Sequence, residues 1–259
     1  MYAPLRLDGM LRVVMEPTAT KSQYRHPSRV LQALVRSPIA RRFYVWMMKR
    51  AFGLRIRNME SVPLPGPYIF ASNHASNYDL FLALAAFCEG AMEQGFGELF
   101  PVPVVWRGML DIPILGSLVN ALPCVLLSHD LGKEEERVAA LREMIGHLRA
   151  GQCLVMSCEG RRCDALTQFQ QGAAFVSLHT KVPVVPISLR GALGLFSGLS
   201  RPDRFHGNVE VILHPPIDPS KFEEAGGTRA EIVARFTEAI RDTVAADLDY
   251  GTEDASAKQ

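Results

Sequence analysis

A histidine and a carboxylate lie five positions apart in the stretch Ser72–Asp79, which reads S-N-H-A-S-N-Y-D. A neutral imidazole such as that of His74 can take the proton from a hydroxyl as its oxygen attacks a carbonyl carbon. A carboxylate bonded to the other ring nitrogen fixes the tautomer and stabilises the imidazolium that forms. Five positions along a straight helix set two side chains about 140° apart. The pair can therefore meet only if His74 lies in a turn and Asp79 in the first turn of a following helix.

The same stretch has a second interpretation. Ser76 and Asp79 have the spacing of a capping box, in which Asp79 caps a helix and His74 is an ordinary turn residue. On these residues alone, capping is the simpler interpretation. The sequence contains neither a G-x-S-x-G elbow, which disfavours a serine hydrolase, nor an H-E-x-x-H cluster, which disfavours a zinc site.

A second polar cluster follows another apolar stretch. Glu159, Gly160, Arg161 and Arg162 come directly after Cys153–Ser157. Arginines at a turn loosened by glycine suit bidentate binding of phosphate or carboxylate, and Glu159 could orient an arginine or bind an acceptor hydroxyl. A charged surface loop is the default interpretation of such a segment seen alone.

Short apolar stretches alternate with helical patterns along the chain, which predicts an α/β fold with a mixed central sheet flanked by helices. The strands we expect are Tyr68–Ser72, Val102–Trp106, Cys153–Ser157, Val184–Leu189 and Val209–Leu213. The helices we expect are Pro38–Phe52, Tyr78–Cys88, Glu134–Ala150, residues 170–180 and a last helix through about Leu248 that a Thr228–Glu231 capping box opens. Both polar clusters would then follow a strand, at the sheet edge where α/β proteins usually bind ligands.

The charge is unevenly distributed. Residues 1–60 carry twelve Lys and Arg against three Asp and Glu, a net charge of +9, whereas the rest of the chain carries a net charge of −8. A cationic segment favours an anionic surface as partner, and we expect peripheral contact with phospholipid headgroups. Nucleic acid is disfavoured because no nucleic-acid-binding signature accompanies the charge. The helix Pro38–Phe52 fits either an interfacial helix or a core helix with a basic edge.

Composition gives the remaining expectations. The chain has 259 residues with 48% hydrophobic and 21% charged residues, enough for a globular body. We expect a basic arm and amphipathic helix over residues 1–53, a catalytic domain over 54–250 and a flexible tail over 251–259. The five cysteines form no C-x-x-C pair, and no secretory signal or membrane span is evident. These features predict a cytoplasmic protein, in peripheral contact with the inner face of the membrane.

The order of the motifs resembles that of the glycerolipid acyltransferase family, which includes the lysophosphatidic acid acyltransferases. That family carries N-H-x-x-x-x-D, a glycine-centred block, F-x-E-G-T-R and an apolar V-P-I-x-P block. The corresponding stretches here are Asn73–Asp79, Ile112–Gly116, Glu159–Arg162 and Val182–Ile187, with Phe169–Ala174 resembling the family's F-K-x-G-A segment. Any one motif is weak, but four in order at plausible spacing favour a catalytic His74 over the capping interpretation.

The resemblance implies a glycerol-3-phosphate acyltransferase-like fold and transfer of a fatty-acyl group to a hydroxyl of a lysophospholipid. The donor would be an acyl-CoA or acyl-carrier-protein thioester, with no other cofactor and no metal. His74 would be the general base and Asp79 its partner. The residues expected to bind substrate are Ser76, Arg107, Glu159, Gly160, Arg161, Arg162 and Pro186. For the oxyanion we expect backbone N–H groups at the start of the helix after His74.

Two departures from the family pattern concern the acceptor. An arginine often follows the glycine block in the family, whereas this chain reads L-L-S-H-D and ends that stretch on Asp130. The usual threonine of E-G-T-R is Arg161, which could replace the missing cation. The alternatives are a non-phosphate acceptor, such as an amino-acid-derived lipid or a specialised metabolite, and a catalytically silent lipid-binding module.

Overall fold

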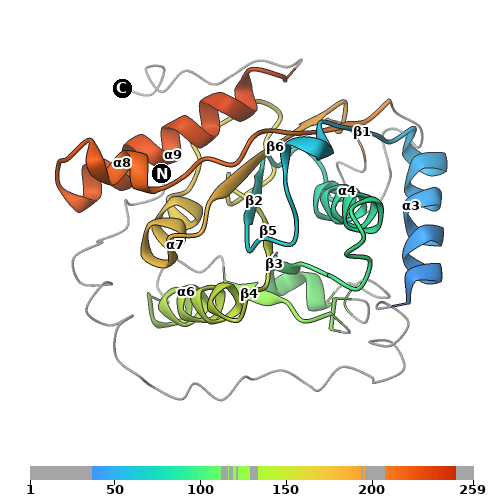
Figure 1. The fold of residues 1–259 in the computed structure, drawn as a ribbon, viewed down its shortest axis with the longest axis horizontal. Coiled ribbons are helices and arrows are strands. Elements are labelled where there is room, and N and C mark those ends of the chain that lie inside the picture. The colour runs from blue at the N-terminus through green and yellow to red at the C-terminus, as the bar shows by residue number, and fades with distance from the viewer. Residues whose placement is uncertain are drawn as a thin grey trace.

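Seven strands form one mixed sheet in the order β1-β7-β6-β2-β5-β3-β4 (Figure 1). The computed structural model describes residues 37–111, 116, 119–120, 122–128, 134–193, 195 and 208–248. The strands are β1 (Arg55–Arg57), β2 (Ile69–Ser72), β3 (Val102–Trp106), β4 (Val125–Leu127), β5 (Leu154–Ser157), β6 (Val184–Arg190) and β7 (Glu210–Leu213). Strands β6, β2, β5, β3 and β4 are parallel neighbours, and β7 runs antiparallel to β6. The predicted α/β class with a mixed sheet is confirmed.

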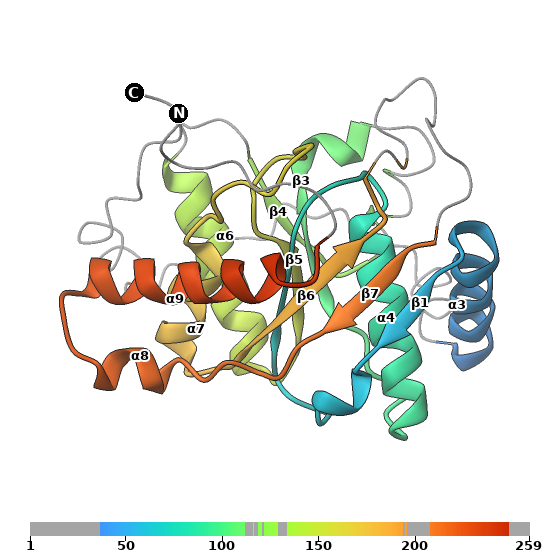
Figure 2. The same cartoon turned by 90° about the horizontal axis from the view of Figure 1, so that it is seen from above.

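Helices cover both faces of the sheet (Figures 1 and 2). They are α3 (Pro38–Phe52), α4 (Asp79–Glu93), α6 (Glu134–Arg149), α7 (Gly172–Thr180), α8 (Ser220–Glu224) and α9 (Arg229–Ala245), with 3-10 turns η1 (Met59–Ser61) and η2 (Arg107–Asp111). Alternate residues of a strand point to opposite faces. In β2, Ile69 and Ala71 accordingly join the core with α6, α7 and α9, and Phe70 joins the core with α3 and α4.

The last strand residues of β2 and β5 lie level with each other. Ser72 pairs with Ser157, and both strands run in the same direction. The segments that follow them therefore leave the sheet at the same edge. This register is what brings the two polar clusters of the sequence to one place.

Helix α3 has two different faces. Arg41, Val45, Met48 and Phe52 are buried against the body, where α3 packs on α4. The other face exposes large apolar side chains: Ile39 is 81% exposed, Phe43 60%, Trp46 58% and Met47 38%. One face of the helix thus packs in the core and the other exposes apolar side chains to solvent. An interfacial role for the exposed face stays a prediction.

Arg41 fastens this helix to the body. Its buried guanidinium donates to the carbonyl of Gly97, to that of Leu99 at 2.7 Å and to that of Glu98 at 3.1 Å. It also lies over the ring of Phe100, 5.4 Å from the ring centroid. Because three carbonyl groups share one charged donor, α3 and the segment that leads into β3 are held as a unit.

Helix α4 differs from its predicted extent. It runs to Glu93 rather than ending at Cys88, and it contains Gly90 within its length. A Cβ on Gly90 would lie 2.3 Å from side-chain atoms of Met59. The glycine thus serves close packing of η1 on the helix and does not end it.

No helix in the described part of the chain combines the length and apolar character needed to cross a bilayer. The segment 1–36, residues 112–115 of the predicted glycine block and Asp130 lie outside the described residues, as does the tail 251–259. The predicted domain boundaries stay predictions.

Candidate active site

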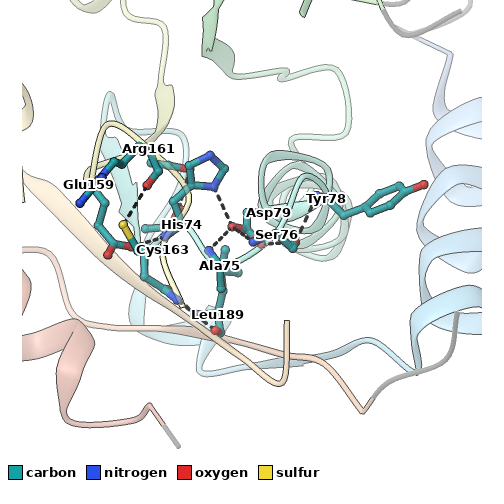
Figure 3. Close-up of polar contacts among 12 residues, drawn as sticks. His74, Ala75, Ser76, Tyr78, Asp79, Glu159, Arg161, Cys163 and Leu189 are labelled. Atoms are coloured by element: carbon teal, nitrogen blue, oxygen red, sulfur yellow. Dashed lines mark hydrogen bonds and ion pairs between the residues drawn. The ribbon is translucent and has the colours of Figure 1, made fainter. Parts of the chain in front are cut away.

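His74 lies in the turn that follows β2, and Asp79 is the first residue of α4. Nδ1 of His74 is 2.9 Å from Oδ2 of Asp79, and Figure 3 shows the ring directed at that carboxylate. The side chain of His74 is 28% exposed, whereas that of Asp79 is fully buried. With Nδ1–H donated to the carboxylate, Nε2 is the ring nitrogen that can accept a proton. The predicted meeting of turn histidine and helix-start carboxylate is confirmed.

Asp79 is held by the turn itself. Oδ2 accepts the backbone N–H groups of Ala75 at 2.6 Å and Ser76 at 2.8 Å, and Oδ1 accepts the hydroxyl of Ser76. The backbone N–H of Tyr78 donates to the same hydroxyl at 3.1 Å. Asp79 therefore holds the turn before α4 and orients His74 at the same time. The N-cap of α4 is Tyr78, which makes no side-chain capping bond, so the predicted capping of the helix by Asp79 is not what the structure shows.

Three N–H groups of the turn are already engaged. Those of Ala75 and Ser76 donate to Asp79, and that of Tyr78 donates to the hydroxyl of Ser76. They hold Asp79 and its partner hydroxyl, and oxyanion donors at the start of the helix stay a prediction.

Asn73 connects the turn to the neighbouring strand β6. Its side-chain Oδ1 accepts the N–H of Leu189 at 2.8 Å, and its Nδ2 donates to the carbonyl of Leu189 at 3.1 Å. Asn73 is completely buried. The side-chain amide takes the place of a backbone partner just where β2 ends, which fixes the residue before His74. The motif contained Asn73, but nothing in the sequence indicated this role.

Glu159 lies on the other side of the His74 backbone from Asp79 (Figure 3). Its Oε2 accepts the N–H of His74 at 2.6 Å, and its Oε1 accepts the N–H of Thr167 at 2.8 Å and the Thr167 hydroxyl at 3.0 Å. Glu159 is 2% exposed. Burial raises the pKa of the Glu159 carboxyl, and the bonds from Thr167 and His74 oppose that rise. Both oxygens are engaged with the protein, and a contact of Glu159 with the acceptor stays a prediction.

The rest of the second cluster forms a turn beside the histidine. Gly160 has φ +73°, a left-handed conformation that favours glycine. Arg161 and Arg162 follow it and are both exposed. The N–H of Cys163 donates to the carbonyl of His74 at 3.0 Å, which closes the loop against the His74 turn. The structure thus places two guanidinium-bearing residues next to the His74 turn, as the sequence predicted.

The other predicted substrate residues lie at different depths. Ser76 is fully buried behind Asp79. Pro186 is buried within β6, level with Ala71 of β2. Arg107 is exposed at the end of β3, with one guanidinium nitrogen 4.0 Å from a carboxylate oxygen of Glu136. Substrate contacts for these residues stay predictions, and the buried position of Ser76 gives it a supporting role toward Asp79.

Trp106 was not singled out from the sequence. It is the last residue of β3 and is 47% exposed. A Cβ at Gly108 would lie 2.2 Å from the Trp106 indole, so the glycine lets the backbone pack against the ring.

Gly116 of the predicted glycine block likewise permits a close approach, because its Cβ would lie 2.1 Å from the carbonyl oxygen of Leu110. Among the described residues, no group of three or more His, Cys, Asp or Glu side chains could hold a metal ion.

The model of the acyltransferase family matches residues 53–190 of this chain. The chain belongs to the acyltransferase family. The matched segment of this family member includes the His74 turn, the Glu159 turn and strand β6, and the resemblance inferred from the motifs is confirmed.

Curated relatives give a consistent description. The family member is 30% identical over 173 residues to the 1-acyl-sn-glycerol-3-phosphate acyltransferase LPAT1 of Arabidopsis thaliana chloroplasts, covering 66% of this chain and 45% of that protein. It is 27% identical over 179 residues to a probable 1-acyl-sn-glycerol-3-phosphate acyltransferase of Mycoplasma pneumoniae, covering 65% and 63% of the two chains. The chain thus spans less than half the length of the plant relative.

A solved structure has the same fold. The 1-acyl-sn-glycerophosphate (LPA) acyltransferase PlsC of Thermotoga maritima aligns with a TM-score of 0.56 and 22% identity, covering 84% of this chain and 79% of that one. At 22% identity the likeness shows a shared fold and nothing about activity. It agrees with the glycerol-3-phosphate acyltransferase-like fold expected from the motifs.

Proposed function

We propose that this chain transfers a fatty-acyl group from an acyl-CoA or acyl-carrier-protein thioester to a free hydroxyl of a lysophospholipid such as 1-acylglycerol-3-phosphate. The observation that carries the proposal is the bond of 2.9 Å between His74 Nδ1 and Asp79 Oδ2, which leaves Nε2 as a base on a partly exposed ring. The names of the relatives support the same substrate class.

The reaction follows from the state of the ring. Nε2 of His74 takes the acceptor's hydroxyl proton while the oxygen attacks the thioester carbonyl, and Asp79 stabilises the imidazolium. Collapse of the tetrahedral intermediate breaks the carbon–sulfur bond, and the departing thiolate receives the proton from Nε2. The products are the ester and a free thiol. A positioned base of this kind contributes about 10²–10⁴ in rate.

The acceptor is anionic in this proposal. Arg107, Arg161 and Arg162 are exposed on segments that follow β3 and β5, which are neighbours in the sheet. Guanidinium groups bind phosphate through paired N–H donors and suit the headgroup of a lysophosphatidate. They also supply positive charge near the developing oxyanion.

A non-phosphate acceptor is the second candidate. It is favoured by the stretch after β4, where Ser128 follows directly and the family's arginine is absent. A silent lipid-binding module is disfavoured, because the His74–Asp79 pair is intact and the ring is accessible.

The outward face of α3 provides the membrane contact in this proposal. Ile39, Phe43, Trp46 and Met47 account for four of the five large apolar side chains exposed in the described part of the chain. Arg42 and Arg50 lie exposed on the same helix. Aromatic residues beside cations are the composition of a helix that rests in the headgroup region of an anionic bilayer. A lipid acceptor would be reached from that surface.

The function is tested by incubating the purified protein with labelled acyl-CoA or acyl carrier protein and a panel of acceptors. The panel contains 1-acylglycerol-3-phosphate, a lysophospholipid with a zwitterionic headgroup and an N-acylated amino acid with a free hydroxyl. We expect ester formation on lysophosphatidate and its loss by about 10²–10⁴ in His74→Ala. Undiminished turnover in His74→Ala would refute the assigned base, and exclusive use of the amino-acid-derived acceptor would establish the second candidate.

A further inference from the structure

The backbone of His74 is held from both sides by one loop. Its N–H donates to Glu159 at 2.6 Å, and its carbonyl accepts the N–H of Cys163 at 3.0 Å. Asp79 fixes the ring, but the ring direction also depends on the peptide groups that carry it. The loop from Glu159 to Cys163 therefore contributes to the orientation of Nε2.

Glu159 is in turn held by Thr167. Two of its three hydrogen bonds come from that residue, one from the backbone N–H and one from the hydroxyl. A buried carboxylate depends strongly on such donors, because each one offsets part of the cost of removing the charge from water. Without them, the carboxylate would lose its fixed orientation toward the N–H of His74.

The last helix completes the chain of contacts. Nε of Arg241, on α9, donates to the carbonyl of Thr167 at 3.0 Å. The Arg241 side chain is 19% exposed, so this bond is largely shielded from water. The contacts thus run from α9 through Thr167 and Glu159 to the backbone of His74. Arg241 lies beyond the segment 53–190 that the family model matches.

We propose that Thr167, supported by Arg241, is a positioning residue for His74: it fixes the Glu159 carboxylate, which fixes the backbone that carries the catalytic ring. This inference rests on the proposed function. It assigns Thr167 no contact with substrate. A defect in positioning reduces kcat more than KM, because the reacting geometry is disturbed while the binding groups remain.

The test compares Thr167→Val with Thr167→Ser. Valine has nearly the shape of threonine and keeps the backbone N–H, but it lacks the hydroxyl donor. Serine retains the hydroxyl donor. We expect kcat of Thr167→Val to fall about tenfold with KM within about twofold, and Thr167→Ser to stay close to the parent protein. A change confined to KM, or an equal loss in the serine variant, would overturn the proposal.

Arg241→Met supplies a second variant that leaves Thr167 intact. Arg235→Met is its matched control, because Arg235 lies on the same helix and donates to the carbonyls of Phe222 and Gly226 instead. We expect a fall in kcat in Arg241→Met alone, and a double variant with Thr167→Val that loses less than the product of the single losses. Independent effects that multiply would show that the two residues do not act through one path.

A readout without turnover separates this inference from the function itself. The backbone N–H of His74 donates to Glu159 Oε2 with a nitrogen–oxygen distance of 2.6 Å. The nuclear magnetic resonance shift of that amide proton therefore reports the bond. We expect the resonance to move in Thr167→Val and to return in Thr167→Ser. A parent protein that esterifies none of the acceptors would defeat the proposed function, whereas an unmoved His74 amide resonance would defeat the positioning role.

Discussion

Ser76 donates to both oxygens of Asp79, through its backbone N–H to Oδ2 at 2.8 Å and through its hydroxyl to Oδ1. Both residues are fully buried. The carboxylate of Asp79 is therefore bonded by a neighbour only three positions away, and its Oδ1 depends on that single hydroxyl among the bonds described above. The strength of the His74–Asp79 pair is thus partly a property of Ser76.

Ser76→Ala is expected to weaken this arrangement without abolishing it. The change removes the donor to Oδ1 and leaves a buried carboxylate oxygen less satisfied, which costs about 1–3 kcal/mol of unfolding free energy. Urea unfolding measures that loss, and steady-state kinetics should show a several-fold lower kcat. A variant with unchanged stability and kcat would mean that the hydroxyl does not support Asp79.

Asp79→Asn is expected to be far more damaging to catalysis than to substrate binding. A neutral amide carries no charge to stabilise the imidazolium. Its NH₂ group would face either the N–H donors of Ala75 and Ser76 or the hydroxyl of Ser76. By analogy with other carboxylate–histidine pairs, the fall in kcat should be about 10²–10⁴. Single-turnover measurements with labelled acyl donor separate the chemical step from binding. Retention of the parent rate would remove Asp79 from the mechanism.

The sequence predicted β2, β3, β5, β6 and β7 and missed the two three-residue strands β1 and β4. Val102–Trp106 was predicted to the residue. By contrast, β1 consists of Arg55, Ile56 and Arg57, whose composition does not indicate a strand. Its backbone pairing with β7 holds it in the sheet. The three residues of β4 lie in a long uncharged run whose pattern alone does not distinguish strand from loop. Tertiary pairing decides such short elements.

The site was predictable where the chemistry is local. The spacing of His74 and Asp79 limited their geometry to one arrangement, and the structure has that arrangement. The role of Asn73 depends on Leu189, 116 positions away, and that of Thr167 depends on a carboxylate in another turn. No short-range pattern encodes such contacts, so only the register of the sheet and the packing of α9 show them.

Removing the aromatic side chains of α3 should release the protein from anionic vesicles. Phe43 and Trp46 stack with ring centroids 5.7 Å apart and stand exposed together. Burial of such a side chain is worth about 1.5–3 kcal/mol, so Phe43→Ser/Trp46→Ser should weaken binding at least about tenfold. Co-sedimentation with phosphatidylglycerol vesicles measures this.

Trp106→Ser is the matched control, because Trp106 is exposed on β3 rather than on α3. Binding of the parent should also weaken with salt, since exposed charges are screened over about 8 Å at physiological ionic strength. Equal binding by the parent and the α3 double variant would contradict the assignment of this face to lipid.

His214 provides a pH-dependent contribution to stability. Its Nε2 lies 2.8 Å from the hydroxyl of Ser188, which itself donates to the carbonyl of Val244, so Nε2–H is the donor. Burial lowers the pKa of His214, and the carboxylate of Asp247 opposes that shift in part. A lowered folded-state pKa means that the unfolded chain binds the proton more readily. Protonation therefore favours unfolding as the pH falls below about 6.5.

His214→Gln keeps a donor for Ser188 but does not titrate in this range. We expect the urea midpoint of the parent to fall more between pH 7.5 and 5.5 than that of the variant, and the two to converge toward higher pH. Parallel curves over that interval would show that His214 does not contribute to the acid sensitivity.

The buried guanidinium of Arg41 has a consequence for the membrane contact proposed above. It bonds α3 directly to the carbonyls of the segment that enters β3. Lipid binding by the exposed face of α3 would therefore set the tilt and height of the sheet above the bilayer in the same step.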